Sequence, residues 1–208
     1  AGWYIMRHNN DYCFIVCGHN GQNGRGGHAH NDKLSFELML DGEDVVVDPG
    51  TYVYTADPEW RNKFRSTVFH NTAYINGKEQ NEIGYDLFIM RSGVEVRVIC
   101  FDEDEDGINF AGEVRYNCSG IIHSREISLR KNSGVVEIRD IVRGTATVRV
   151  SFCLGPAAEK YSFASEFGNF LKEQGWYSKS YGRRDRTDMF IIPGLGGLVR
   201  INPRLGRL

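Results

Sequence analysis

The residues of this chain best suited to chemistry are three of its six histidines and a nearby aspartate. His28 and His30 are two residues apart, so on an extended backbone their side chains point to the same side. Asp48 and His70 add a carboxylate and a third imidazole. A set of two imidazoles and one carboxylate can bind zinc and leave one position open for water or substrate. Judged by residue types alone, a zinc site and a polar loop whose imidazoles bond buried backbone groups are about equally supported.

A predicted β-hairpin positions this group. Apolar residues at alternate positions from 34 to 40 predict a strand with one buried face. Residues 41–42, Asp-Gly, predict a turn, after which the apolar run 45–47 returns antiparallel to the first strand. In such a hairpin, the residue after the second strand lies beside the residue before the first. The pairing therefore predicts that Asp48 lies near His30.

Most of the remaining chain consists of short apolar runs that end at turn residues, with almost no helical periodicity. This pattern is typical of an all-β protein, and we predict a large antiparallel β-sandwich. Asp57 and Pro58 supply a helix cap and a first helical position, so a predicted helical turn begins there. From 155 to 182 the pattern weakens, and a last strand follows the Gly-rich stretch 193–197. The other predicted strands are 73–75, 94–101, 108–116, 121–130, 135–142 and 147–154.

Composition restricts the possible partners. The 208 residues are enough for one substantial core, and we predict a single domain over 1–208. The net charge of −2 provides no overall field for nucleic acid or an anionic membrane, so an acidic ligand needs local cations such as Arg61, Lys63 and Arg65. We expect no membrane span, because no apolar run approaches ~20 residues, and the first residues lack the layout of a signal peptide. The sequence leaves the localisation undetermined.

The five cysteines are odd in number, so at least one lies outside any intrachain disulfide. Their spacing matches no paired metal-binding pattern. Cys13 and Cys17 are four residues apart on a predicted strand, so they share a face, and we predict that they belong to the core.

The segment that carries the histidines resembles a known family signature. Residues 28–36, His-Ala-His-Asn-Asp-Lys-Leu-Ser-Phe, resemble that of the heparinase II/III family of polysaccharide lyases. The resemblance is strong over residues 27–80 and weaker at His123-Ser124-Arg125 and Tyr181-Gly182. The further matching residues are Asp48-Pro49-Gly50-Thr51-Tyr52, Tyr54, Asp57-Pro58-Glu59, Arg61-Asn62, Phe64-Arg65-Ser66-Thr67, His70-Asn71-Thr72, Asn76-Gly77 and Gln80.

The resemblance implies a reaction and a role for each histidine. In these lyases a base removes the proton at C5 of a uronic acid and the 4-linked oxygen leaves, so no water is consumed. The neighbouring carboxylate must be neutralised for that proton to be acidic enough. By resemblance, His28 is the catalytic residue, in proton transfer or carboxylate neutralisation. His30, Asp48 and His70 match the positions of a mainly structural zinc ion.

The resemblance also implies that a domain is missing. The family normally carries an N-terminal α/α toroid that supplies a tyrosine and further polar residues to the active site, and nothing in these 208 residues resembles it. We therefore predict two partners, an acidic polysaccharide and a toroid domain of the same protein. We expect the isolated chain to be inactive or nearly so. Heparan sulfate, alginate and other uronate-containing glycans all stay open as substrates.

Tyr52, Tyr54, Arg61 and Arg65 are the candidate substrate-binding residues. Tyrosine rings stack on sugar rings, and the planar fork of arginine pairs with carboxylate or sulfate. For each residue taken singly, a structural role is the stronger interpretation. The tyrosines would then pack at the edge of the sandwich, and the arginines would bond backbone carbonyls.

Two other functions fit the same residues. A non-catalytic carbohydrate-binding or scaffold β-sandwich with a structural metal would keep its saccharide affinity after His28→Ala. A self-contained zinc hydrolase would cleave with water and form no unsaturated product. A lyase product, in contrast, absorbs in the ultraviolet because elimination creates a conjugated double bond.

Overall fold

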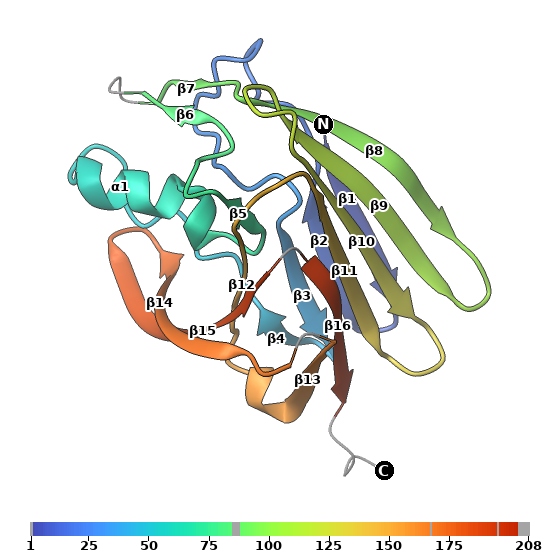
Figure 1. Cartoon of the computed structure of the whole chain (residues 1–208). Helices are drawn as coiled ribbons and strands as arrows, with labels where there is room; N and C mark the ends of the chain where they lie inside the picture. Colours follow the sequence, from blue (N-terminus) through green and yellow to red (C-terminus); the bar gives the residue numbers. More distant parts are fainter. Residues whose placement is uncertain (1, 85–87, 167, 195, 204–208) are drawn as a thin grey trace.

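The computed structural model describes residues 2–84, 88–166, 168–194 and 196–203. In these residues the chain forms antiparallel sheets that stack on one another, with a short helix beside one end of the stack (Figure 1). The all-β sandwich predicted from the sequence is confirmed. The described part of the chain contains no helix with the length and hydrophobicity that a membrane crossing requires.

One four-stranded sheet contains the predicted hairpin. Its order is β1 (Trp3–His8), β2 (Asp11–Val16), β3 (Phe36–Leu40) and β4 (Glu43–Val46). Every apolar side chain at alternate positions from 34 to 40 is buried, as the pattern predicts. Asp41 and Gly42 have φ of 53° and 78°, the left-handed conformation that a tight two-residue hairpin requires.

The opposite layer is a six-stranded sheet, and a second four-stranded sheet extends the first. The six strands are β13 (Tyr161–Ser165), β16 (Gly196–Pro203), β11 (Val136–Arg143), β10 (Ile122–Arg130), β9 (Gly107–Tyr116) and β8 (Val94–Glu103). The second four-stranded sheet has the order β14 (Leu171–Ser180), β15 (Arg183–Pro193), β12 (Val148–Cys153) and β5 (Ala73–Ile75). A bridge between Val46 and Leu154 connects the two four-stranded sheets.

The core lies between these layers. Arg125 on β10 shows the contact directly, because its guanidinium lies 5.4 Å from the ring centre of Phe36 and 6.0 Å from that of Phe152. Those two rings belong to β3 and β12, one from each four-stranded sheet. Cys13 and Cys17 are buried, which confirms their predicted place in the core.

The remaining elements are short. Helix α1 (Pro58–Arg65) begins where the sequence predicts, with Asp57 as its cap. The other short elements are the 3-10 turns η1 (Thr67–Phe69) and η2 (Ala158–Lys160) and the small sheet of β6 (Glu82–Ile83) and β7 (Met90–Arg91). The predicted strands between residues 73 and 154 all form. β1, β13, β14 and β15 are not among the predicted strands.

Candidate active site

Asp48 and His70 form a close pair next to the end of β4. The Nδ1 atom of His70 lies 2.8 Å from Oδ2 of Asp48, and Oδ1 of Asp48 accepts a 2.8 Å hydrogen bond from the Gly50 amide. Burial by itself lowers the pKa of His70, but the Asp48 carboxylate outweighs it and the pKa is raised. Burial conversely favours the neutral form of Asp48, and His70 outweighs it, so the pKa of Asp48 is lowered. The opposite shifts mean that each group stabilises the charged form of the other.

His30 lies beside this pair. Its ring centre is 5.2 Å from that of His70, and burial, then the proximity of His70, lowers the pKa of His30 to about 4. His30 is therefore neutral near pH 7 and has a ring nitrogen that can act as an electron-pair donor. His30 and Asp48 both lie beside His70, which agrees with the hairpin prediction that the two residues are close.

The three predicted zinc ligands lie close together. Asp48 and His70 are hydrogen-bonded to each other, and His30 lies next to His70. Within the described ranges, no group of three or more His, Cys, Asp or Glu side chains has the arrangement of a metal site. One feature does fit a bound cation. The Nε2 atom of His70 is buried and has no hydrogen-bond partner among the described residues, although a buried polar atom normally has one.

His28 adopts a different backbone conformation from the one predicted. The expected extended backbone over residues 28–30 is wrong, because His28 lies in a turn with φ of 61°. The Ala29 amide bonds the Gly26 carbonyl at 2.9 Å, which closes this turn. The exposed His28 ring stacks on Phe88, with centres 4.2 Å apart, and meets the edge of Tyr54 at 5.4 Å. A left-handed conformation in a residue other than glycine is often found at functional sites.

His28 and His30 nevertheless face a common space. They line a hollow of about 380 Å³ in front of the loop that carries them. Lys33, also in its wall, is already paired, because its Nζ lies 2.8 Å from Asp32 Oδ1 and 3.1 Å from the His30 carbonyl. Its other lining residues include Trp3 and His19, which the sequence pattern does not single out.

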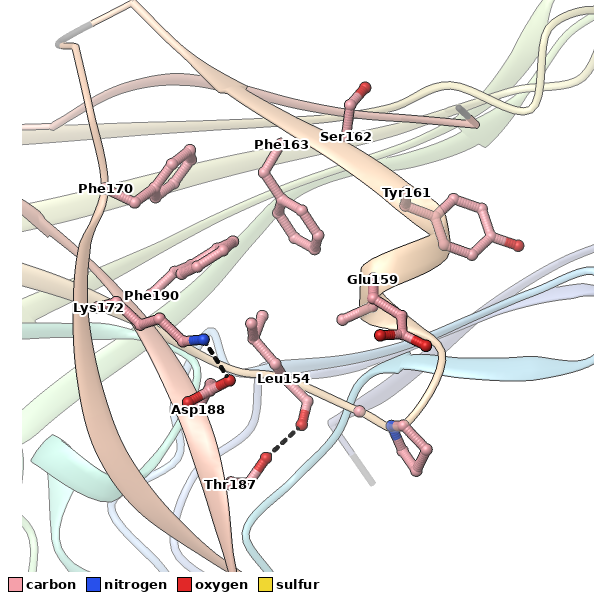
Figure 2. A pocket seen from close by; sticks show the side chains of 13 residues that line it. Leu154, Glu159, Tyr161, Ser162, Phe163, Phe170, Lys172, Thr187, Asp188 and Phe190 are labelled. Carbon is pink, nitrogen blue, oxygen red and sulfur yellow. Dashed lines mark hydrogen bonds and ion pairs between the residues drawn. The ribbon is translucent and has the colours of Figure 1, made fainter. Parts of the chain in front are cut away.

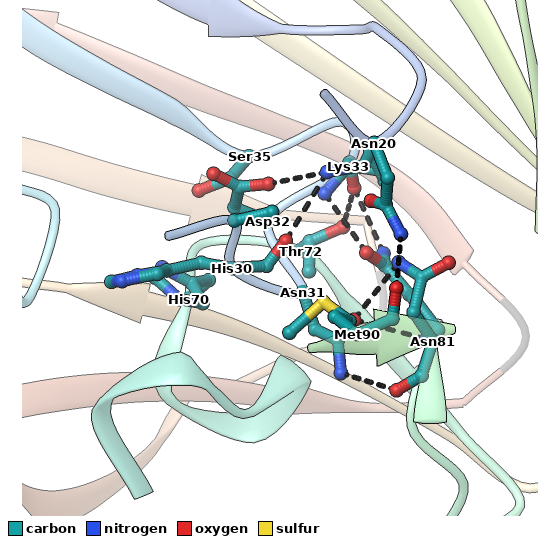
Figure 3. A network of polar contacts seen from close by, with 12 residues as sticks. Asn20, His30, Asn31, Asp32, Lys33, Ser35, His70, Thr72, Asn81 and Met90 are labelled. Carbon is teal, nitrogen blue, oxygen red and sulfur yellow. Dashed lines mark hydrogen bonds and ion pairs between the residues drawn. The ribbon is translucent and has the colours of Figure 1, made fainter. Parts of the chain in front are cut away.

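A buried network of amide side chains lies beside His30 and holds the chain segment that follows it (Figure 3). Asn31 is fully buried, and its amide donates to Glu79 Oε2 at 2.6 Å and to the Asn81 carbonyl at 2.9 Å. The Asn31 side-chain oxygen accepts from the Asn81 amide at 2.9 Å. Gln80 bonds both the amide and the carbonyl of Lys33, each at 2.9 Å. Asn31, Asn81 and Gln80 therefore fix the loop and do not face the hollow.

Arg65 supports the same loop from helix α1. It is 2 % exposed, and its Nε donates to the Ala29 carbonyl at 3.1 Å and its Nη2 to the Phe88 carbonyl at 3.3 Å. Its own carbonyl accepts from the Asn31 amide at 2.9 Å. These are the structural bonds that the sequence analysis names as the alternative to substrate binding. The predicted role in substrate binding stays a prediction.

The other three candidate binding residues have different environments. Arg61 is buried, at 3 % exposed. The Tyr52 ring packs 5.3 Å from that of Phe64, inside the aromatic cluster around α1. Tyr54 is 41 % exposed and touches His28, so of the four it is the one that a glycan can reach most directly. Their contact with substrate stays a prediction.

Comparison with known proteins identifies the family. The model of the family "Heparinase II/III-like, C-terminal" matches residues 1–160. This chain belongs to that family. It is 26 % identical over 183 residues to a heparin-sulfate lyase of Bacteroides stercoris, a match that covers 76 % of this chain and 25 % of that protein. The chain therefore spans about a quarter of the length of this relative.

The fold comparison agrees with the family. A solved heparinase III superimposes with a TM-score of 0.78 at 18 % identity, over 97 % of this chain and 34 % of that one. A heparan sulfate lyase, HepC from Pedobacter heparinus, gives 0.77 at 17 % identity, over 100 % of this chain and 36 % of that one. At such identities the likeness concerns the fold of the heparinase II/III-like C-terminal domain.

In this heparinase-like domain, the opposite sheet also contributes to the site. Arg125 on β10 is fully buried and pairs with Asp140, with Nε and Oδ1 2.8 Å apart and Nη2 and Oδ2 2.9 Å apart. Its Nη1 donates to the Leu34 carbonyl at 2.7 Å and to the Asn71 carbonyl. Those carbonyls lie close in sequence to His30 and next to His70. Arg125 belongs to the weaker part of the family resemblance, and its bonds to the Leu34 and Asn71 carbonyls give it a structural role beside the site.

A second hollow of about 540 Å³ lies at another end of the domain (Figure 2). The rings of Phe163, Phe170 and Phe190 form its apolar side, and Lys172 and Asp188 pair at 2.7 Å beside them. No histidine lines it. We therefore place the candidate active site at the hollow that contains His28.

Proposed function

We propose that this chain is the C-terminal domain of a polysaccharide lyase that cleaves uronate-containing acidic polysaccharide by β-elimination. Membership of the heparinase II/III-like family and the lyase activities in the names of its relatives support this. The observation that carries the proposal is His28. Its imidazole is exposed but held in one orientation by Phe88 and Tyr54, which is what proton transfer to or from a bound sugar requires.

In the proposed reaction, the C5–H bond of a uronic acid breaks and its electron pair forms a C4–C5 double bond. The bond between C4 and the leaving oxygen breaks at the same stage. The proton from C5 goes to a base, and the leaving oxygen receives a proton from an acid. His28 acts in one of these transfers or, when protonated, neutralises the C5 carboxylate. We propose that an N-terminal domain of the full protein supplies the remaining groups.

The test uses the full-length protein and a uronate polymer. We expect cleavage with rising ultraviolet absorbance, and a kcat reduced by about 10²–10⁴ in His28→Asn. Asparagine tolerates the left-handed backbone of residue 28 but cannot act as an acid or base near neutral pH. Cleavage without this absorbance would indicate hydrolysis and contradict the proposal.

We propose further that the chain alone binds such polymers but does not cleave them. The test compares this chain with the full-length protein in the same absorbance assay. Turnover by the isolated chain at the full-length rate would contradict this part of the proposal. If the full-length protein binds but never cleaves, the domain is a carbohydrate-binding scaffold.

We also propose that His30, Asp48 and His70 hold a zinc ion. The unpartnered Nε2 of His70, the neutral imidazole of His30 and the ionised Asp48 support it. When bound, the ion would hold three chain segments together behind His28, which is a structural role.

Elemental analysis of the purified chain tests the zinc proposal. We expect close to one zinc per chain, lost in His30→Ala and in Asp48→Ala and kept in the control His8→Ala. A wild-type chain without metal, purified in zinc-containing buffer, would overturn it.

A further inference from the structure

We propose that the tip of the β14–β15 hairpin is a binding subsite for a negatively charged sugar unit next to His28. We define the hairpin tip as residues 179–183, Lys-Ser-Tyr-Gly-Arg. The proposal deepens the proposed function, because the glycan is taken to be the substrate of the same site. The sequence pattern is weak in this region, and only the structure brings the tip to the active-site loop.

The hairpin tip is fastened to the segment between Asp48 and Tyr54. The Gly182 amide donates to the Tyr52 carbonyl at 2.7 Å, and the Ser178 amide donates to the Pro49 carbonyl at 2.8 Å. The Ser178 hydroxyl bonds the carbonyls of Ser180 and Arg183 at 3.1 Å and 2.7 Å, which closes the turn. These bonds therefore fix the position of the hairpin tip relative to Asp48, a candidate zinc ligand.

An aromatic surface connects the hairpin tip to His28. Tyr181 is 61 % exposed, and its ring centre lies 5.5 Å from that of Tyr54. Tyr54 in turn meets the edge of the His28 ring. Two exposed tyrosines in contact provide an apolar face for sugar C–H groups and hydroxyls for hydrogen bonds. An exposed pair of large rings beside a catalytic candidate indicates a binding surface.

The hairpin tip is also positively charged. Residues 179–183 contain two cations, Lys179 and Arg183, and no acid, in a chain with a net charge of −2. Lys179 and Arg183 are exposed, and neither forms an ion pair with another described residue. Ammonium and guanidinium groups bind carboxylate and sulfate by charge-assisted hydrogen bonds. The charges of Lys179 and Arg183 are therefore available to an acidic glycan.

Arg184 keeps the base of the hairpin tip rigid. Its guanidinium lies 3.3 Å from the ring centre of Trp60 on α1, 4.7 Å from Trp176 on β14 and 4.8 Å from Tyr52. Cation–π contacts of this kind join helix α1 to the hairpin. The tyrosines and cations above it are therefore presented on a pre-ordered surface, which lowers the entropy cost of binding.

The test measures binding of a heparin hexasaccharide to this chain by titration calorimetry at two salt concentrations. We expect Tyr181→Ala to weaken the affinity about threefold to tenfold, and Tyr181→Phe to keep most of it. We expect the pair Lys179→Ser and Arg183→Ser to weaken it further and to reduce the salt dependence. Phe101→Ala and Lys172→Ser serve as matched controls, since they remove an exposed ring and an exposed cation elsewhere.

Unchanged affinity in the Tyr181→Ala and the double-serine variants would overturn the subsite, as would a wild-type chain that does not bind. Because the hairpin tip is exposed, the unfolding temperature of each variant reports whether the fold is intact. The lyase reaction is tested separately by the ultraviolet product of the full-length protein. If that product is absent while the variants lose affinity, the proposed reaction fails and the subsite stands.

Discussion

At the scale of single residues, the arginine that the family signature places in α1 acts on the backbone of the His28–His30 loop. Arg65 donates to two carbonyls, Ala29 and Phe88, that lie on either side of the His28 ring contact. A lysine in its place carries the same charge but lacks the planar fork that reaches both carbonyls. The geometry of Arg65 is therefore more important than its charge.

We expect Arg65→Lys to lower the free energy of unfolding by about 1–3 kcal/mol, because at least one buried carbonyl loses its donor. Urea denaturation measures it. Arg115→Lys is the control, since Arg115 is exposed on β9 and does not belong to the His28 loop or to α1. If Arg65→Lys kept full stability and lost only glycan affinity, the predicted role in substrate binding would be preferred.

His123 makes the stability of the domain depend on pH. It is fully buried, and burial lowers its pKa from 6.5, although its hydrogen bond to Asp140, at 2.6 Å, opposes this. Arg125, which shares Asp140, also lowers the pKa. Because the unfolded state binds the proton more readily, the stability from neutral His123 is present above pH 6.5 and is lost as the pH falls below it.

We expect the urea midpoint of the wild type to fall between about pH 6.5 and pH 5. In His123→Gln, whose amide can still donate to Asp140, the fall should be smaller. The other titrating groups are the same in both proteins, so the difference isolates His123. Equal slopes in the two proteins would show that His123 does not titrate on unfolding.

At the scale of secondary structure, the start of helix α1 is determined by Asp57 and Pro58. Oδ1 of Asp57 accepts a 3.1 Å hydrogen bond from the Trp60 amide, and Pro58 occupies the start of the helix. Through Arg65 and Trp60, this helix contacts both the His28 loop and the β14–β15 hairpin. A frayed start of α1 would therefore loosen two parts of the proposed binding surface.

We expect Asp57→Ala to destabilise the domain by about 1 kcal/mol, the usual contribution of a helix cap. Thermal unfolding followed by circular dichroism measures it. Glu59→Ala is the control, because Glu59 is exposed and its pair with Lys63 contributes little. A larger loss in the control than in Asp57→Ala would contradict the assigned cap.

The elements that can be predicted from sequence are those with one buried face. The alternation over residues 34–40 predicts β3, and every alternate side chain there is buried. Strand β14 shows the opposite case. Residues 171–174 are all exposed, so no alternation marks the strand, and it exists because it pairs with β15. The subsite at the hairpin tip therefore could not be predicted from a hydrophobic pattern.

The geometry of the candidate site can also be predicted only in part from the sequence. The hairpin pattern predicts that Asp48 approaches His30, and the structure agrees, because both residues lie beside His70. The sequence alone gives no indication that the backbone at His28 is a left-handed turn and not extended. His28 lies in a left-handed turn, and its ring contacts Tyr54 and Phe88, which come from segments distant in the sequence.

At the scale of the whole molecule, a buried arginine, Arg125, connects the two layers. Arg125 and Asp140 belong to the six-stranded sheet, and Arg125 bonds carbonyls of the opposite layer. We expect Arg125→Met to cost about 3–5 kcal/mol, because Asp140 is left charged and buried. Chemical denaturation measures it.

The double variant Arg125→Met with Asp140→Leu should recover part of this loss, because no unpaired charge remains. The recovery should be incomplete, since the carbonyls of Leu34 and Asn71 still lose their donor. No recovery at all would show that the cost comes from the carbonyls, from packing and from buried His123, which loses its Asp140 partner.

The bonds that shape the site also determine when it can form during folding. The bond from Arg125 to the Leu34 carbonyl joins residues 91 apart in sequence, and that from the Cys153 amide to Asn71 joins residues 82 apart. Contacts of such separation form late, because the intervening chain must first lose its freedom. A nascent or truncated chain that ends soon after residue 80 would contain every strongly matching residue of the signature. It would lack the strands that shape the site, so glycan binding should arise only once residues beyond 153 have been made and folded.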